Sequence, residues 1–577
     1  MSIEPSKSIS RPCLFLIVWT ASLIPFSGRA QYPSFELGGL ARGVADVGYL
    51  SPEDTVVQDV SVESHALYDL ALRGEITPKA QVYIELRLGT NLALFDTSAS
   101  YAQVRRVVLS GSLLDNWSYE IGDVDVAWTP FTIWNSPSEG VVNESMLFAQ
   151  WRQLQNYENF SVTEAWRLRG ARFHGGWTRG SGTKLKSSSF ISRIQESDEV
   201  FKPDVIFAGS AMEWIRNRAS LAIRAQDFAT LGSTVIEGKS SHVVGFSGEA
   251  SWTCDDWTLR GEAGGSLATR LVEDEVQVYP AGAVRGGYWH LSGTFQFKED
   301  WKARISARSV SDTYISPGAQ TKRILYSQSP QVFPLLSNGQ WGRSLMQGDL
   351  LTARTHLQQG RPWNRVIHRG LMPFDPRYGT AMPYGLATPN RRALSADLEQ
   401  GKLEDFWSIR ASLSILQDLT PEGSPNRRHF LNTLLSGHAN LDQWWHGSRT
   451  VRLQGGWQHQ RVSRAEAALD PVNVFVNVLD AGLDWFVSET LVMSYGIKRI
   501  AAEGLDYLAL RNQDFTVIGF DRVDLNVRDE LHALGLTWRL NENTEATLQW
   551  QQWSMQETAP DHRGIVSRVL FLFQTTF

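Results

Sequence analysis

Apolar and polar residues alternate with a period of two along most of the chain, from about residue 35 to its end. The clearest runs lie at 82–88, 257–263, 289–297, 301–307 and 407–415. Successive side chains of a β-strand point to opposite faces, so this pattern predicts strands with one apolar and one polar face. Helical spacing is nowhere comparably clear. The predicted fold class is therefore all-β.

The connections between these predicted strands are alternately short and long. Short turns lie at 77–79, 115–116, 216–218, 254–256, 298–300, 403–405, 487–489 and 541–543. Longer polar connections lie at 129–165, 195–203, 230–240, 268–282 and 312–391. This asymmetry is typical of a transmembrane β-barrel, which has brief periplasmic turns at one rim and long external loops at the other.

Pairing each short turn with its two flanking segments predicts a single closed antiparallel barrel. The expected number of strands is about 22, within a range of roughly 18 to 24, and it is even. The sheet has to close because every backbone polar group inside a bilayer needs a partner. Asp349 to Thr355 is a candidate for one more hairpin, and a change of face after Gly122 predicts a bulge or a change of direction there.

Tryptophan recurs where a predicted strand meets a short turn. Trp117, Trp257, Trp301, Trp407 and Trp485 each follow such a turn. Amphipathic rings favour the headgroup level of a membrane, where the apolar body contacts lipid and the N–H contacts water. The repetition predicts an aromatic girdle at the turn rim. The alternative is ordinary core tryptophan in a large soluble β protein.

The first thirty residues have the pattern of a secretory signal peptide. Lys7 and Arg11 precede an apolar run at 13–19, and Gly28 and Ala30 supply small residues at a cleavage site. We therefore expect residues 1–30 to be removed and residues 31–577 to form the barrel. The alternative is an N-terminal membrane anchor, for which the apolar run is short.

Composition narrows the class of protein further. The chain has 577 residues, a net charge of −6 and two cysteines. A net negative charge argues against a nucleic-acid partner, and two cysteines exclude a disulfide-stapled scaffold. After the first thirty residues no run reaches the ~18 apolar residues of a membrane-spanning helix, which excludes a multi-helix membrane protein.

The end of the chain carries a family resemblance. Val569, Phe571, Phe573 and Phe577 alternate with other residues up to the C-terminus, with Thr575 departing from the usual aromatic or aliphatic choice. This resembles the terminal signal of bacterial outer-membrane β-barrel proteins, and the chain looks porin-like, although no narrower family is indicated. The resemblance is close over the last ten residues, and in the rest of the chain it consists only of the repeated pattern of predicted strands. It implies a Gram-negative outer membrane, contact with its lipid, and recognition by the barrel-insertion machinery.

A barrel of this size is too wide to be filled by its own wall, so its lumen holds water or is occluded by loops. Arginine is prominent on the predicted polar faces, and its fixed charged fork suits carboxylate, phosphate or sulfate groups. Alternatively, Arg–Glu ladders between neighbouring strands satisfy one another and stiffen the wall. The candidate lumen or constriction residues are Arg87, Arg260, Arg304, Arg308, Arg365, Arg369, Arg377, Tyr378, Arg410 and Arg452.

Two long connections stand out. Residues 360–392 contain five prolines, which lower the entropy cost of fixing a loop, and loops of this length are usually functional or disordered. Folded inward, this segment would form a constriction; otherwise it is an external cap. Residues 129–165 are polar and aromatic, which suits either an entrance lining or a partner contact.

Motifs for catalysis are missing from the sequence. It has no G-x-S-x-G elbow, no H-E-x-x-H and no Cys/His spacing suited to zinc. We predict no catalytic residue, no cofactor and no metal site. The leading hypothesis is a channel for passive or selective passage of small polar solutes. A non-conducting barrel that serves as a surface binding or assembly platform is the alternative, and a barrel-borne hydrolase is a third.

Overall fold

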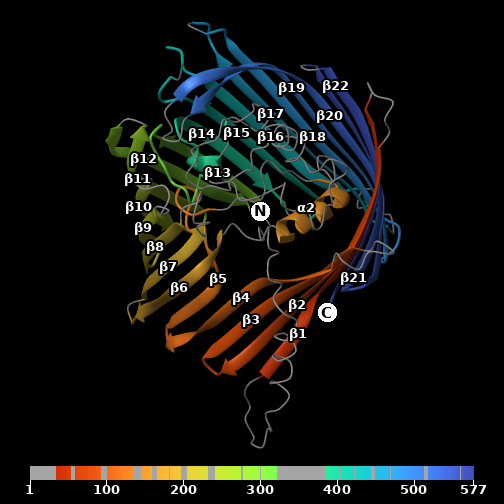
Figure 1. Ribbon diagram of the computed structural model, residues 1–577, viewed down its shortest axis with the longest axis horizontal. Coiled ribbons are helices and arrows are strands. Elements are labelled where there is room, and N and C mark those ends of the chain that lie inside the picture. Colours follow the sequence, from red (N-terminus) through yellow and green to blue (C-terminus); the bar gives the residue numbers. More distant parts are fainter. Residues whose placement is uncertain are drawn as a thin grey trace, which may run out of the picture.

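The computed structural model describes most of the chain as one sheet. The described residues are 34–52, 59–91, 100–134, 144–158, 166–180, 182–195, 204–231, 241–274, 277–298, 300–320, 381–382, 384–401, 405–421, 423–442, 449–467, 469–511, 517–558 and 561–577. They form a 22-stranded antiparallel sheet that closes on itself, because β1 pairs with both β2 and β22 (Figure 1). The predicted all-β class, single closed barrel and strand number are confirmed.

The strands follow one another around the barrel in chain order. Their bounds are β1 Ser34–Pro52, β2 Asp59–Thr77, β3 Ala80–Asn91, β4 Tyr101–Leu114, β5 Trp117–Val126, β6 Trp166–Arg179, β7 Thr183–Gln195, β8 Asp204–Arg216, β9 Ala219–Leu231, β10 Ser241–Thr253, β11 Trp257–Asp274, β12 Gln277–Lys298, β13 Trp301–Val310, β14 Arg391–Gln400, β15 Trp407–Gln417, β16 His429–Asn440, β17 Val451–Arg464, β18 Val472–Phe486, β19 Leu491–Arg511, β20 Val517–Asn541, β21 Thr544–Thr558 and β22 Asp561–Thr576. Among the described residues, the α-helix α2 (Met146–Glu158) lies between β5 and β6, and the 3-10 turn η3 (Gly385–Ala387) lies between β13 and β14.

The barrel closes between its first and last strands. The register of β1 and β22 runs from Leu40 opposite Thr576 to Pro52 opposite Gly564. At the rim Gly39 and Phe577 exchange both backbone hydrogen bonds, at 2.8 and 3.1 Å. The described ends of the sheet therefore lie at the same rim, as an even number of strands requires.

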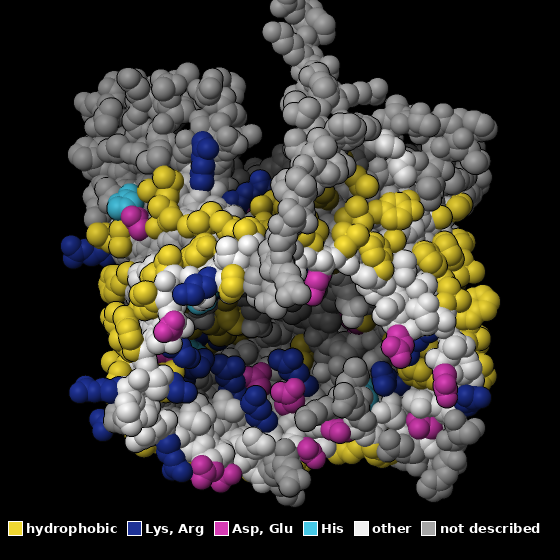
Figure 2. Space-filling model, turned by 90° about the horizontal axis from the view of Figure 1, so that it is seen from below, with side chains coloured by type: hydrophobic (Ala, Val, Ile, Leu, Met, Phe, Trp, Pro, Cys, Tyr) yellow, Lys and Arg dark blue, Asp and Glu magenta, His cyan; other side chains and the backbone are white. Residues whose placement is uncertain are grey.

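The outward face is an apolar belt. Every second residue of β22 points outward, with Val569 45% and Phe571 41% exposed, and Phe577, directly after the strand, is 56% exposed. Of the five predicted girdle tryptophans, Trp407 and Trp485 are exposed, at 40% and 44%, and the other three are partly buried. Trp252 and Trp538, just before two of the short turns, are 51% and 55% exposed. Hydrophobic side chains cover the outer flanks of the molecule (Figure 2). The predicted girdle is thus present on the outside of the barrel, at the rim where we expected it.

One predicted connection is wrong. Residues 268–282 were expected to form a long loop, but β11 continues to Asp274 and β12 begins at Gln277. The two strands stay paired up to Asp274 opposite Gln277. Where a strand extends beyond the bilayer, its outer face contacts water instead of lipid, so apolar and polar residues no longer alternate along it. Such a segment has the sequence pattern of a loop.

The predicted irregularity at Gly122 is confirmed. Gly122 has a φ of +115°, and the pairing of β4 with β5 stops at Val108 opposite Gly122. A Cβ atom on this residue would lie 2.1 Å from the carbonyl oxygen of Val107, so only glycine fits. The extra hairpin considered at Asp349 to Thr355 falls outside the described residues. It is not needed for closure, because β13 pairs directly with β14 over ten positions.

Candidate functional site

The barrel interior is the candidate site, and it is built in two layers. Near the long connections, the inner faces of the strands are apolar and pack against chain that folds into the barrel. Three buried clusters form this loop-side layer, one around α2, one around Ile133 and one around Phe131. Near the short turns, the inner faces carry charged side chains. We call these the loop-side layer and the turn-side wall.

Helix α2 belongs to the connection between β5 and β6 and lies inside the ring of strands (Figure 1). Its first turn sits on three inward-facing glycines of neighbouring strands. A Cβ at Gly482 or Gly496 would lie 2.6 or 2.9 Å from the Cβ of Ser145, and one at Gly535 would lie 2.3 Å from Leu147 Cδ2. The wall is therefore hollowed to the shape of the helix.

Buried charges hold the same end of α2. Lys498 Nζ on β19 donates to Glu144 Oε2 at 2.7 Å and to Asp480 Oδ1 at 2.6 Å, with its side chain fully buried. The ammonium also lies 4.8 Å from the centre of the Phe148 ring. Because an isolated buried charge is costly, this pairing ties the start of the helix to β18 and β19.

A second clamp holds the far end of α2. The hydroxyl of Tyr157 donates to Asp69 Oδ2 at 2.7 Å and lies 3.1 Å from Glu85 Oε1. Arg105 stacks over the ring at 4.3 Å and donates to the Tyr157 carbonyl oxygen at 3.0 Å. Burial, followed by the negative charges of Asp69 and Glu85, raises the pKa of Tyr157 well above its usual range. The phenol therefore stays protonated and keeps donating.

The two clamps make α2 a strap across the interior. The first clamp is on β18 to β20 and the second is on β2 to β4, so the helix spans the sector that contains the closing seam. Its 13 residues cover about 20 Å at 1.5 Å per residue. The strap takes up part of the cross-section that an open barrel would leave empty.

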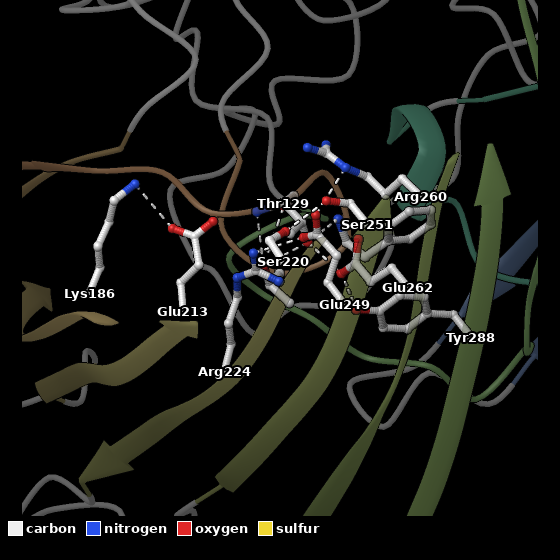
Figure 3. A network of polar contacts seen from close by, with 12 residues as sticks. Thr129, Lys186, Glu213, Ser220, Arg224, Glu249, Ser251, Arg260, Glu262 and Tyr288 are labelled. Carbon is white, nitrogen blue, oxygen red and sulfur yellow. Dashed lines mark hydrogen bonds and ion pairs between the residues drawn. The ribbon is translucent and has the colours of Figure 1, made fainter. Parts of the chain in front are cut away.

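Residues 127–134 and 311–320 fill the other side of the loop-side layer. Thr129 and Tyr288 both donate to Glu262 Oε1, at 2.7 and 2.6 Å (Figure 3). Tyr314 donates to the Phe131 carbonyl oxygen at 2.6 Å, and burial raises the pKa of Tyr314. The bond from Tyr314 joins two connections that are about 180 residues apart in the chain, and the bonds to Glu262 attach the first of them to β11.

The ends of the longest connection also fold inward. Gln320 Nε2 donates to the Ala387 carbonyl oxygen at 2.9 Å, and Ala387 is fully buried beside Tyr288 and Val310. Most of the segment 360–392 lies outside the described residues, including Arg365, Arg369, Arg377 and Tyr378. Whether those four residues form a constriction stays a prediction. Residues 384–390, where the structure describes this segment, lie against the loop-side layer and not outside the barrel.

The turn-side wall is ionic. Glu249 receives Arg224 at 2.8 Å and Arg260 at 2.9 Å from the two neighbouring strands, and Lys186 lies 3.3 Å from Glu213 (Figure 3). Figure 2 shows one face of the molecule hollowed between its walls, with Lys, Arg, Asp and Glu side chains gathered along the hollow. The cross-strand pairs fit the predicted ladders, but they account for only part of the wall.

Arg304 and Arg410 have the same place on β13 and β15 as Arg260 has on β11. Each lies three residues after the tryptophan that begins its strand. Arg304 and Arg410 are exposed and make no ion pair among the residues that the structure describes. Their register partners on β14 are Asp397 and Glu399. The Trp-x-x-Arg repeat is a sequence signal that could have set these three arginines apart from the other candidates.

The remaining strand candidates are more enclosed. Arg87 is buried and holds both oxygens of Asp69 at 2.7 Å, so it belongs to the Tyr157 clamp. Arg308 is buried at 2% exposure and donates to Met382 Sδ at 2.8 Å. Arg452 is half-buried and donates to Asn440 Oδ1 at 3.2 Å. The structure thus separates the predicted set into arginines of the turn-side wall, two arginines that fasten inward segments (Arg87 and Arg308), and Arg452, which bonds to the neighbouring strand β16.

The strap itself escaped the sequence prediction. Leu147, Trp151 and Leu154 have the i, i+4, i+7 spacing of a helix, which was the available signal. The segment is short and polar on average, so this spacing did not stand out. Within the described residues, no helix is long and apolar enough to cross a membrane. The same part of the chain contains no group of three or more His, Cys, Asp or Glu placed to hold a metal ion.

The closed sheet and its apolar outer belt define the class of protein. Such a barrel spans a membrane with its strands, in contact with lipid, and its architecture is that of a porin-like protein of the bacterial cell outer membrane. No protein-family model and no curated protein sequence matches the chain.

Solved outer-membrane barrels resemble the chain in overall form. The outer membrane protein opdK from Pseudomonas aeruginosa is 9% identical, with 94% of this chain and 99% of that chain covered and a TM-score of 0.32. OccK11 (OpdR) from the same organism is 8% identical over 94% and 96%, with a TM-score of 0.35. The ferric citrate transporter FecA is 7% identical over 94% and 78%, with a TM-score of 0.43. The likeness is limited to the closed barrel.

Proposed function

We propose that the protein is an outer-membrane channel through which small polar solutes pass along the turn-side wall. The observation that carries this proposal is the exposed, unpaired state of Arg304 and Arg410 among the described residues, on the inner side of the barrel. A charged side chain without a partner is stable where water or a passing ion solvates it. Figure 2 shows Lys and Arg side chains, together with Asp and Glu, along the hollowed face of the molecule.

The proposed preference is for anions. Guanidinium groups that already share a carboxylate, as Arg224 and Arg260 share Glu249, have much of their charge neutralised within the wall. Arg304 and Arg410 keep theirs available. A row of such charges raises the local concentration of carboxylate- or phosphate-bearing solutes. The proposal assigns no catalytic step, cofactor or metal to the chain.

Planar bilayers test this function. Purified protein whose folding is shown by heat-modifiability should give stepwise conductance, and a salt gradient should give a reversal potential of the sign for anion preference. Arg304→Gln and Arg410→Gln together should move that potential toward zero. Ile305→Gln, on the outward face next to Arg304, is the matched control. Fully folded protein that never conducts would refute the channel.

Two further predictions belong to export and assembly. We propose that residues 1–30 are removed as a signal peptide, and that Val569, Phe571, Phe573 and Phe577 are recognised by the barrel-insertion machinery. Val569 and Phe571 are exposed on the outward face of the last strand, and Phe577 is exposed directly after it. N-terminal sequencing of protein from outer membranes tests the first point. Phe577→Ser, which should lower the amount inserted, tests the second.

A further inference from the structure

The outward face of the neighbouring strands β14 to β17 changes from apolar to polar in one row across the sheet (Figure 1). On the turn side of this row the face is apolar, with Ile415 56% exposed. The next outward residue of β15 is Gln417, which lies opposite Arg392 on β14 and His429 on β16 in the register. We call these three residues, together with the outward Arg461 on β17, the cationic row.

The cationic row lies at the loop-side edge of the apolar belt. Gln417 follows the girdle residue Trp407 by ten residues. At a rise of about 3.3 Å per residue and a strand tilt of about 40°, ten residues correspond to a height of about 25 Å. The lipid-facing band of an outer-membrane barrel has a height of about 25 Å as well. The row is therefore level with the lipid headgroups on the side of the long connections, which is the external side of such a barrel.

The positive charge of the row is not balanced on the same face. Arg392 and Arg461 are both exposed, and neither has an ion pair within the described part of the chain. The structure describes every residue of β14 to β18, and each Asp or Glu on these five strands has an inward position: Asp397, Glu399, Asp480 and Asp484. The outward face of this sector therefore carries a net positive charge.

Two other outward charges of the barrel show the difference, because each has a carboxylate beside it. On β9 and β10, His242 Nε2 lies 2.5 Å from Asp227 Oδ1. On β19 and β20, Arg499 Nε lies 4.0 Å from Glu530 Oε2. Pairing of outward charges within the wall is thus possible in this barrel, and the sector of the cationic row lacks the carboxylates for it.

Neutral groups orient the two arginines of the row. Arg392 Nε donates to Gln417 Oε1 at 2.9 Å, and Gln417 Nε2 lies 3.3 Å from His429 Nε2. The guanidinium of Arg461 lies 5.1 Å from the centre of the Phe475 ring on β18. These contacts hold the guanidinium groups without neutralising them. A guanidinium fork binds phosphate oxygens through two parallel hydrogen bonds, so phosphate is a suitable partner for both arginines.

We propose that the cationic row binds a membrane lipid that carries phosphate groups in its headgroup. Leu394, Leu413 and Ile415 are exposed on the same outward face, and they offer an apolar surface to the acyl chains of that lipid. Basic side chains at the membrane surface attract anionic lipids, and each of them adds to the affinity. The site lies on the outside of the barrel, so it does not depend on the proposed channel. It holds one headgroup at a fixed place on the circumference.

Native mass spectrometry of the purified protein in detergent tests the site, with diphosphoryl lipid A and a neutral galactolipid as probes. Lipid A should be retained at least tenfold more strongly than the galactolipid. Arg392→Gln and Arg461→Gln together should weaken lipid A binding about tenfold or more, since two charges near the membrane surface are lost. Arg392→Lys with Arg461→Lys, which keeps both charges, should bind between wild type and the Gln variant. Arg304→Gln with Arg410→Gln is the matched control, because it removes the same charge from the inner wall.

The outcomes decide between a lipid site and its alternatives. Heat-modifiability confirms that each variant is folded. Equal retention of the two lipids, or a loss in the inner-wall control as large as in the variant of the row, would overturn the site. Inorganic phosphate at millimolar concentration should leave lipid A bound; its displacement would assign the row to the free anion and overturn the lipid. The variant of the row should keep the reversal potential of wild type, so the channel and the lipid site are tested separately.

Discussion

The two layers of the barrel interior use the same strands for opposite purposes. On β9, Phe228 is 1% exposed within the loop-side layer, while Arg224, four residues nearer the turn, belongs to the ionic wall. The inner face of a strand is therefore apolar where inward chain covers it and charged where the hollow begins. Whether an inner side chain is apolar or charged therefore depends on whether it faces inward-folded chain or the hollow.

The first way to break this comparison is to remove the buried cation of the strap. Lys498→Ala takes away the ammonium that lies within 2.7 Å of both Glu144 and Asp480. Breaking a buried ion pair by removing one partner costs about 3–5 kcal/mol, so unfolding should need markedly less urea. Lys186→Ala, which breaks the exposed pair with Glu213, should cost under about 1 kcal/mol. Similar losses in both variants would contradict the division into layers.

The second test fills the hollow in which the strap lies. In Gly496→Ala the new methyl would approach Phe148 Cε2 to 2.5 Å and Ser145 Cβ to 2.9 Å. Overpacking of this kind destabilises the folded protein by about 1–3 kcal/mol. The folded band in gel electrophoresis should therefore convert to the unfolded band at a lower temperature than in wild type. In Gly248→Ala nothing lies within 4 Å of the added atom, so that variant should stay near wild type. An unchanged Gly496→Ala would mean that the helix is not seated there.

The third test loosens the other end of the strap. Tyr157→Phe removes the hydroxyl that joins Asp69 and Glu85, which should lower the free energy of unfolding by about 1–3 kcal/mol. Because the strap is then held less firmly, the channel current should become larger and noisier. Tyr83→Phe is the control, since Tyr83 also donates to Glu85, at 3.2 Å, but belongs to the wall. Equal currents in the two variants and wild type would show that the strap does not limit flow.

The same hydroxyl gives a dependence on pH. Because the folded-state pKa of Tyr157 is raised above that of a free tyrosine, its contribution to stability is complete below about pH 10 and is lost as the pH rises further. Between pH 9 and pH 11 the melting temperature of wild type should therefore fall further than that of Tyr157→Phe. A parallel loss in both proteins would contradict the clamp.

The smallest effect concerns the charge of the turn-side wall. Replacing Arg304 or Arg410 alone by Gln should lower the preference for anions by roughly two- to tenfold, because the other wall charges stay in place. Arg87→Gln should instead act on stability, since Arg87 is buried against Asp69. Reversal potentials and urea unfolding of the three variants separate the two roles. A selectivity change in Arg87→Gln alone would reverse the assignment.

The fold could be predicted from the sequence, and the filling of the barrel could not. Strands, turns, the girdle and the backbone irregularity at Gly122 follow from local patterns, because the lipid side of each strand has to be apolar. Inward packing of residues 144–158 depends on glycines at 482, 496 and 535, which are hundreds of residues away in the chain. Those contacts leave no local pattern. Likewise, sequence puts Arg87 and Arg304 in one class, and only the position of Asp69 and Tyr157 separates them.

Cysteine modification at two adjacent positions tests the central claim most directly. In a Cys254→Ser background, Arg304→Cys faces the interior and Ile305→Cys, 54% exposed in wild type, faces lipid. Adding a negatively charged thiosulfonate to single channels should reduce the current in steps for Arg304→Cys and leave Ile305→Cys unchanged. Proven labelling of Arg304→Cys without any change in current would contradict a conducting turn-side wall.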